Sequence, residues 1–233
     1  MKEFDVKELL DEEVEVEELS FLQRVVCVFT DPKRAFSSMR NNPKILRALA
    51  IIILAGVGSI LLTIADGSMK EQIIGQLQAA GQPVTDSAIN MAIGAGAVIG
   101  AIGVIGIPFL IALIYHVCAM IQSKTGYKKT LAIYLHSQFI VVLGSIIVTV
   151  ITMATGKVIQ FSPAMFMDPN QVSSTLYLIA SLFNVFTIWG LFVLFTGFKE
   201  THGMTTKEAI ITIAIPAILG IVLIFVSTNM VAV

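Results

Sequence analysis

A glycine-rich stretch, MAIGAGAVIGAIGVIGIP at residues 91–108, contains residue types that could bind a dinucleotide. Its first glycines come close to the spacing of a pyrophosphate-binding turn. Such a turn follows a strand, opens a helix and is followed after about 20 residues by an acid that binds the ribose. Here the stretch lies inside a continuous apolar run, and no acid follows Asp86 until Asp168. A dinucleotide turn is therefore excluded.

The glycines of this stretch fit a helix–helix contact better than a ligand site. Gly96, Gly100 and Gly103 are spaced at i, i+4 and i+7, which places them on one face of a helix. In lipid, small residues on such a face let two backbones approach closely. We predict that these three glycines form a helix-packing face and that Pro108 kinks the same helix near its middle.

Two histidines, His116 and His136, lie inside apolar runs that a short polar turn connects. A rise of 1.5 Å per helical residue places both about 10 Å below the same membrane surface. With Tyr115 and Gln138 nearby, they would form a polar pocket, and ionisable groups inside a membrane are costly enough to indicate function. The alternative is a neutral, hydrogen-bonded pair that holds the two helices together.

Nothing else in the sequence is typical of catalysis. It contains no nucleophile–base–acid set and no Walker loop, and two histidines without a third ligand do not make a zinc site. Cys27 and Cys118 have neither metal-ligand nor disulfide-framework spacing. We therefore expect no catalytic residue, no metal and no cofactor, and an intramembrane enzyme is the weakest of the functional hypotheses.

The composition defines the elements that must position these residues. The chain has 233 residues, of which 56% are hydrophobic and 13% are charged, whereas a soluble domain has about 25% charged residues. Apolar runs long enough to cross a bilayer need about 20 helical residues. We predict an all-α, polytopic membrane protein with five transmembrane helices, at about 45–65, 90–121, 130–153, 173–198 and 208–231.

Basic residues are concentrated in the segments that would face one side of the membrane. That side has the following bases: Arg24, Lys33, Arg34, Arg40, Lys44, Arg47, Lys124, Lys128, Lys129, Lys199 and Lys207. The opposite side has Lys70 and Lys157. Because cytoplasmic loops are enriched in Lys and Arg, we predict a multi-pass cell-membrane protein with its N-terminus in the cytoplasm and its C-terminus outside.

The chain divides into three parts. Residues 1–19 are an acidic cytoplasmic head, residues 20–43 form amphipathic basic helices, and residues 44–233 form the membrane domain. Ser20 can cap the first amphipathic helix, and Pro32 suits the first turn of the second. We expect both helices to lie along the anionic cytoplasmic leaflet. The basic residues expected to contact the membrane surface are Arg24, Lys33, Arg34 and Arg40.

The last two spans contain further polar signals. Asn184 and Trp189 in the fourth span are expected to contribute interhelical hydrogen bonding and packing. Thr205 and Glu208, three residues apart, predict a capping box at the start of the fifth span, and Gly203 predicts the end of the fourth.

The order of these motifs resembles a known family. The segment FLQRVVCVFTDPKRAF leads through NNP into the spans, GYKKTLAIYLHSQ opens the third span, and THGMTTKEA opens the fifth. This layout resembles the bacterial branch of the Yip (Ypt-interacting protein) family. The resemblance implies a non-enzymatic membrane protein that binds other membrane proteins, and some bacterial relatives are accessory subunits of ABC export systems.

The sequence therefore supports two functional hypotheses of different kinds. The first is an integral membrane adaptor or accessory protein, whose partners are the lipid bilayer and other membrane proteins, such as ABC transporter subunits, or a second copy of itself. The alternative is a small transporter or lipid-handling protein that uses the polar pocket around His116 and His136. We expect no nucleic-acid partner.

Overall fold

The computed structural model describes residues 18–122, 126–156, 159–168 and 175–230. Within these ranges the chain is helical and contains no strand, so the predicted all-α class is confirmed. Most of the predicted acidic head, residues 1–17, lies outside the described residues.

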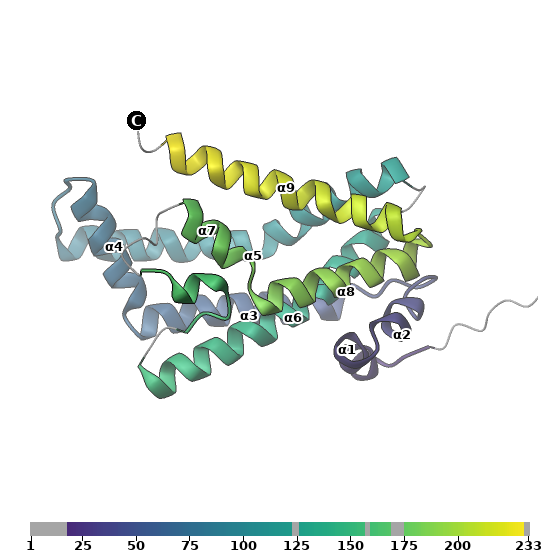
Figure 1. Cartoon of the computed structure of the whole chain (residues 1–233). Helices are drawn as coiled ribbons and strands as arrows, with labels where there is room; N and C mark the ends of the chain where they lie inside the picture. Colours follow the sequence, from purple (N-terminus) through teal and green to yellow (C-terminus); the bar gives the residue numbers. More distant parts are fainter. Residues whose placement is uncertain (1–17, 123–125, 157–158, 169–174, 231–233) are drawn as a thin grey trace, which may run out of the picture.

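Among the described residues, four helices are long and apolar enough to cross a membrane. They are α3 (Leu46–Ala65), α5 (Asp86–Gln122), α6 (Tyr127–Thr155) and α9 (Thr206–Met230). They run roughly along one common axis (Figure 1). Their positions match the predicted first, second, third and fifth spans to within a few residues.

The fourth predicted span is broken into two helices. α7 (Thr175–Leu182) and α8 (Val185–His202) meet at an angle of 53°, and the chain has five spans if this bent pair counts as one. The Asn184 side chain accepts a hydrogen bond from the Phe186 backbone N–H at 2.9 Å, so it caps α8. The prediction that Asn184 makes an interhelical hydrogen bond is therefore wrong. A short polar side chain competes for local backbone donors and favours a helix start over a helix interior.

A loop fills the break between α7 and α8. The Val185 backbone N–H donates to the Phe161 carbonyl at 3.0 Å, just before the short helix η1 (Pro163–Phe166). Gln160 in the same loop donates to the Tyr177 hydroxyl of α7 at 2.7 Å. These bonds satisfy polar groups that a broken helix leaves exposed, as a membrane protein requires.

Two short helices precede the spans, as predicted. In α1 (Phe21–Thr30), Ser20 and Gln23 form a reciprocal capping box. In α2 (Pro32–Ser37), the Asp31 side chain accepts from the Arg34 backbone N–H at 3.2 Å, with the proline in the first turn. The predicted helix starts at Ser20 and Pro32 are therefore confirmed.

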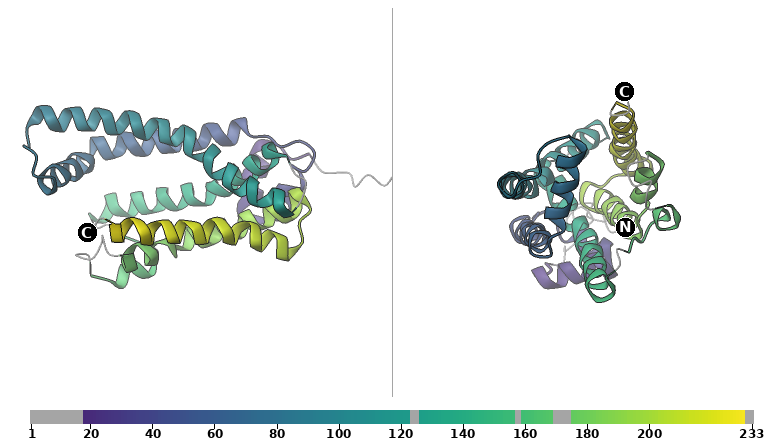
Figure 2. Two further views of the ribbon diagram at one scale, coloured as in Figure 1. Left: turned by 90° about the horizontal axis from the view of Figure 1, so that it is seen from above. Right: turned by 90° about the vertical axis from the view of Figure 1, so that its left-hand side faces the viewer.

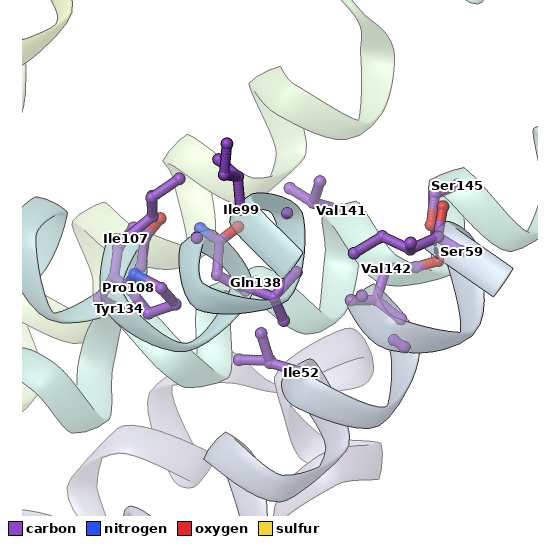
Figure 3. Close-up of a pocket in the computed structure, with 16 residues that line it drawn as sticks. Ile52, Ser59, Ile99, Ile107, Pro108, Tyr134, Gln138, Val141, Val142 and Ser145 are labelled. Carbon is purple, nitrogen blue, oxygen red and sulfur yellow. Dashed lines mark hydrogen bonds between the residues drawn. The ribbon is translucent and has the colours of Figure 1, made fainter. Parts of the chain in front are cut away.

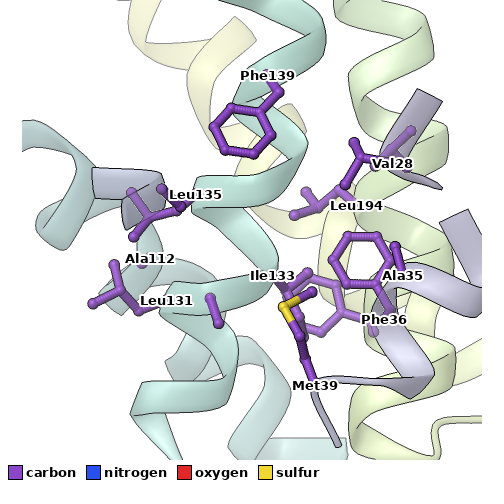
Figure 4. Close-up of a cluster of buried hydrophobic side chains, with 14 of the residues drawn as sticks. Val28, Ala35, Phe36, Met39, Ala112, Leu131, Ile133, Leu135, Phe139 and Leu194 are labelled. Carbon is purple, nitrogen blue, oxygen red and sulfur yellow. The ribbon is translucent and has the colours of Figure 1, made fainter. Parts of the chain in front are cut away.

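These two helices pack into the core of the protein. Val28, Phe36 and Met39 are fully buried and share one hydrophobic cluster with side chains of α6 and α8 (Figure 4). Thr201 of α8 donates to the Phe36 carbonyl at 3.2 Å. Residues 20–43 are thus held by the membrane domain at one end of its helices, and their position along the leaflet stays a prediction. An amphipathic pattern identifies an apolar face but not the surface that covers it.

The two ends of the helix bundle carry different elements. α1 and α2 lie at one end, while α4 (Ser68–Ala79) and the end of α9 lie at the other (Figures 1 and 2). At the α1–α2 end, Gly203 ends α8 with a left-handed φ of 68°. Thr205 and Glu208 then form the predicted capping box, with bonds of 2.7 and 3.3 Å between each backbone N–H and the other side chain.

Candidate functional site

A cavity of about 680 Å³ lies between α3, α5 and α6 near the middle of these spans (Figure 3). We call it the α3–α5–α6 groove. It is lined by Ile52, Ala55, Gly56, Ser59, Ile60, Ile99, Gly100, Gly103, Val104, Ile107, Pro108, Tyr134, Gln138, Val141, Val142 and Ser145. Most of these residues are apolar or small.

Two glycines bring α3 and α5 together along one side of the groove. A Cβ added to Gly56 would lie 2.6 Å from the nearest methyl carbon of Val104. A Cβ added to Gly100 would lie 3.1 Å from Cδ1 of Ile60. Each helix thus contributes a glycine that accepts a branched side chain of the other.

The three glycines predicted to form one packing face lie in different surroundings. Gly100 contacts α3, as described above. The nearest atom to a Cβ on Gly103 belongs to Ile107 of the same helix, at 3.4 Å, and Gly96 has nothing within 4 Å. Within the described residues, only Gly100 of this set meets a second helix. Gly103 instead lines the groove and leaves room for an outside molecule.

The proline in this part of α5 affects the shape of the groove wall. Pro108 lies inside α5, which changes direction in its second half (Figure 2). The Tyr127 hydroxyl of α6 donates to the Phe109 carbonyl of α5 at 2.9 Å. This bond joins the two helices beside the proline.

Two polar side chains of the groove, Gln138 and Ser59, lack hydrogen-bond partners among the described residues. Gln138 points into the groove (Figure 3), and Ser59 lines it from α3. Within the described residues, neither side chain makes a hydrogen bond. An amide without a partner at this depth is costly, because hydrocarbon offers neither donors nor acceptors. The groove therefore favours a ligand that brings its own polar group.

A second polar arrangement joins three helices at the α1–α2 end. His116 Nδ1 of α5 lies 3.2 Å from Thr130 Oγ1 of α6, and the same hydroxyl lies 3.1 Å from His202 Nε2 of α8. One hydroxyl can donate to one imidazole nitrogen and accept from the N–H of another. We call this set the His–Thr–His cluster, and it links α5, α6 and α8.

The four residues predicted to form one polar pocket lie in separate surroundings. His116 belongs to the His–Thr–His cluster and Gln138 to the groove. His136 is fully buried, its Nδ1 lies 2.7 Å from the Ala132 carbonyl of its own helix, and its Nε2 is buried without a partner in the described residues. Tyr115 is buried with its ring 6.0 Å from that of Phe198. His136 and Gln138, two positions apart on a helix, face different directions.

The sequence did not indicate that Thr130 and His202 join His116 in one cluster. Thr130 is fully buried although it stands only four residues after Gly126, and His202 ends α8. The sequence does place both residues close to predicted cytoplasmic turns, on the same predicted side of the membrane as His116, and this could have indicated the cluster. Within the described residues, no group of three or more His, Cys, Asp or Glu side chains could hold a metal ion.

The basic residues expected at the membrane surface also differ in their surroundings. Lys33 and Arg34 are exposed, and Arg40 donates to the Glu200 carbonyl at 2.9 Å. Arg24 is 1% exposed and points into the protein, so it does not lie on an exposed face of α1, and its contact with the membrane surface stays a prediction. It lies on the face of α1 that packs against the bundle, where Cys27 and Val28 are also buried.

Comparison with known proteins agrees with this architecture. The family model described as Yip1 domain matches residues 26–227, from within α1 to near the end of α9. The chain belongs to the Yip1 domain family. The resemblance drawn from the sequence motifs is therefore confirmed.

A curated relative of this Yip1 domain protein is similar over most of its length. The membrane protein YknW of Bacillus subtilis (strain 168) is 27% identical over 203 residues, which cover 85% of this chain and 86% of YknW. No solved structure matches the chain. The Yip1 domain match includes the α3–α5–α6 groove and the His–Thr–His cluster.

Proposed function

We propose that this Yip1 domain protein is a non-enzymatic membrane adaptor that binds a transmembrane helix of another integral membrane protein in the α3–α5–α6 groove. The observation that carries the proposal is the Gln138 amide, which lies in a membrane-depth cavity without a hydrogen-bond partner in the described residues. A polar group on a partner helix would satisfy this amide. Such bonds between helices contribute about 0.6–2 kcal/mol in lipid.

The lining of the groove favours a helix over a lipid chain. A helix needs small residues to approach closely, and Ala55, Gly56, Gly100 and Gly103 provide them. An acyl chain would fill the same volume but would leave the amide unpaired. Gly96, one turn before Gly100, faces open space and extends the surface of small residues along α5.

We further propose that the α1–α2 end faces the cytoplasm. Among the described residues, the bases of the N-terminal helices and those at the start of α6 and α9 lie at this end, which is the charge distribution expected of a cytoplasmic face. The resemblance to bacterial accessory subunits makes a subunit of an ABC export system the first partner class to test.

The experiment is quantitative co-purification of the tagged full chain from its native membranes in mild detergent. Gln138→Leu removes the amide and keeps a side chain of similar size. Asn90→Leu is the matched control, because it removes an exposed amide of α5 outside the groove. We expect Gln138→Leu to reduce recovery of the partner membrane protein severalfold and Asn90→Leu to leave it unchanged.

Two outcomes would contradict the proposal. The first is equal recovery of the partner with both variants, when Gln138→Leu elutes as a single species and keeps the fluorescence of its single tryptophan, Trp189. The second is recovery of a second copy of this chain alone, which would make the groove a homodimer interface.

The alternative of a transporter or lipid-handling protein with a pocket around His116 and His136 is less well supported. These two side chains occupy separate surroundings, one hydrogen-bonded to Thr130 and the other to its own helix. They therefore offer no common binding surface for a substrate.

A further inference from the structure

A second cavity, of about 610 Å³, lies where α3 and α6 begin, at the α1–α2 end of the bundle. We call it the basic cavity. It is lined by Leu19, Ser20, Phe21, Arg24, Pro43, Lys44, Ile45, Leu46, Arg47 and Lys128. Among the described residues no acidic side chain lines it, whereas four of its residues are cationic.

Arg24 forms the inner wall of this cavity. Its Nε donates to Ser38 Oγ at 3.3 Å and its Nη2 donates to the Leu19 carbonyl at 3.0 Å. The remaining nitrogen, Nη1, is buried and has no partner in the described residues. Both partners are neutral, and a buried guanidinium without an anion is strongly unfavourable. Burial lowers the pKa of Arg24 below its ordinary value, and the nearby Glu18 opposes that change.

The first turn of α3 faces the same cavity through Ile45, Leu46 and Arg47. The first turn of any helix has backbone N–H groups without intrahelical partners, and the helix dipole favours an anion there. At α3 no side chain caps these groups, because the N-cap residue Ile45 has no polar side chain. An anion in the cavity would satisfy the helix start and the guanidinium together.

The remaining cations lie at the mouth of the cavity. Lys44, Arg47 and Lys128 are exposed, and within the described ranges none of them pairs with a carboxylate. The guanidinium of Arg47 lies over the Phe21 ring, 5.8 Å from its centre, which holds it beside the cavity. Because two spans begin here, the mouth lies at the level of the lipid headgroups.

We propose that the basic cavity binds the phosphate of an anionic phospholipid from the leaflet at the α1–α2 end. The phosphate lies between Arg24, the start of α3 and the three exposed cations. A phosphate offers several acceptor oxygens, which suits two guanidinium groups, two ammonium groups and backbone N–H donors at once. This inference is independent of the helix-binding groove, which lies at mid-span.

The test measures stabilisation of the full chain in neutral detergent by short-chain phospholipids. Dioctanoyl phosphatidylglycerol is titrated while the thermal unfolding midpoint is followed, with dioctanoyl phosphatidylcholine and inorganic phosphate in parallel. A ligand that binds the folded state raises this midpoint in a saturable way. We expect saturable stabilisation by phosphatidylglycerol and little by the other two probes.

Two triple variants separate a built site from general electrostatics. Lys44→Gln/Arg47→Gln/Lys128→Gln removes the cations at the mouth. Lys33→Gln/Arg34→Gln/Lys207→Gln removes the same charge from exposed positions that do not line the cavity. We expect the first variant to weaken phosphatidylglycerol binding at least about tenfold and the second to weaken it by less than about twofold.

Equal losses in the two variants would overturn the proposal, because diffuse attraction depends on charge alone. Equal stabilisation by inorganic phosphate would assign the cavity to a soluble anion instead. Arg24→Lys tests the guanidinium itself, since lysine keeps the positive charge but lacks the planar set of N–H donors. If Arg24→Lys does not fold, the comparison of the two triple variants still tests the proposal.

Discussion

The contact between α2 and α8 depends on Gly197, and replacing this residue by alanine tests how tightly the N-terminal helices are held. A Cβ at this position would lie 2.5 Å from Ile133 Cγ2 and 3.1 Å from Cε1 and Cζ of Phe36. Ile133 and Phe36 are fully buried, so neither side chain has free space to move into. Gly197→Ala should therefore push α6 and α2 away from α8.

Two opposing effects set the size of the change in stability. Overpacking a well-filled core costs about 1–3 kcal/mol. Alanine is a better helix former than glycine by about 0.5–1 kcal/mol. We expect Gly197→Ala to lower the free energy of unfolding by about 1–2 kcal/mol. Gly220→Ala in α9 is the control, because a Cβ there meets nothing within 4 Å, and it should leave stability unchanged or slightly raised.

The assay is reversible unfolding of the full chain by SDS in mixed micelles, followed by tryptophan emission. Trp189 is the single tryptophan and packs edge-to-face on Phe29 of α1, with ring centres 6.0 Å apart. Labelling of the buried Cys27 by a maleimide reports separately on release of α1. Wild-type stability of Gly197→Ala, with unchanged Trp189 emission and Cys27 labelling, would refute this description of the contact.

Three further substitutions have defined expectations. Thr130→Val removes the hydroxyl between His116 and His202 and should lower the free energy of unfolding by about 1–3 kcal/mol; stability equal to wild type in the SDS titration would contradict the bridging role. Asn184→Ala removes the cap of α8 and should cost about 0.5–2 kcal/mol, whereas Asn184→Asp should stay close to wild type in the same titration. Arg40→Ala breaks an exposed contact with Glu200 and should change thermal stability by less than about 1 kcal/mol; a larger loss would mean that this contact anchors α2.

Much of the helical framework could be predicted because lipid restricts the choices. A long apolar run in a membrane must satisfy its own backbone, so it forms a helix, and loop charge gives a testable orientation. The break at Asn184 was not predicted, since one polar residue in an apolar run does not distinguish an interhelical bond from a cap. In the structure, the loop before η1 supports the break, because its Phe161 carbonyl accepts a hydrogen bond from the Val185 backbone N–H.

The packing of α1 and α2 against the bundle shows a different limit of the sequence. Their amphipathic pattern correctly predicted helices with one apolar face, but lipid and protein are equally suitable covers for such a face. The deciding feature is the small surface at Gly197 on α8, which receives Phe36 from more than 150 residues earlier in the chain. Long-range complementarity of this kind is not visible in local periodicity.

The sequence predicted the positions of the candidate residues along their helices but not the directions in which their side chains point. His116 lies beside Thr130 of α6, whereas His136 contacts its own helix, so each histidine faces a different neighbour. Of the glycines on α5, spacing identified Gly100 but could not indicate that its contact is Ile60. Gly56 of α3 was missed because its contact with Val104 depends on how α3 and α5 are aligned.

Binding of a partner's transmembrane helix in the α3–α5–α6 groove is tested most directly by site-specific photo-crosslinking in native membranes. A photoreactive phenylalanine analogue replaces Ile99, which lines the groove and is 69% exposed, or Val222, a 49% exposed position on α9. We predict a discrete adduct with another membrane protein from position 99 and none from position 222. The absence of any protein adduct at position 99, or an adduct with a second copy of this chain alone, would contradict the proposed function.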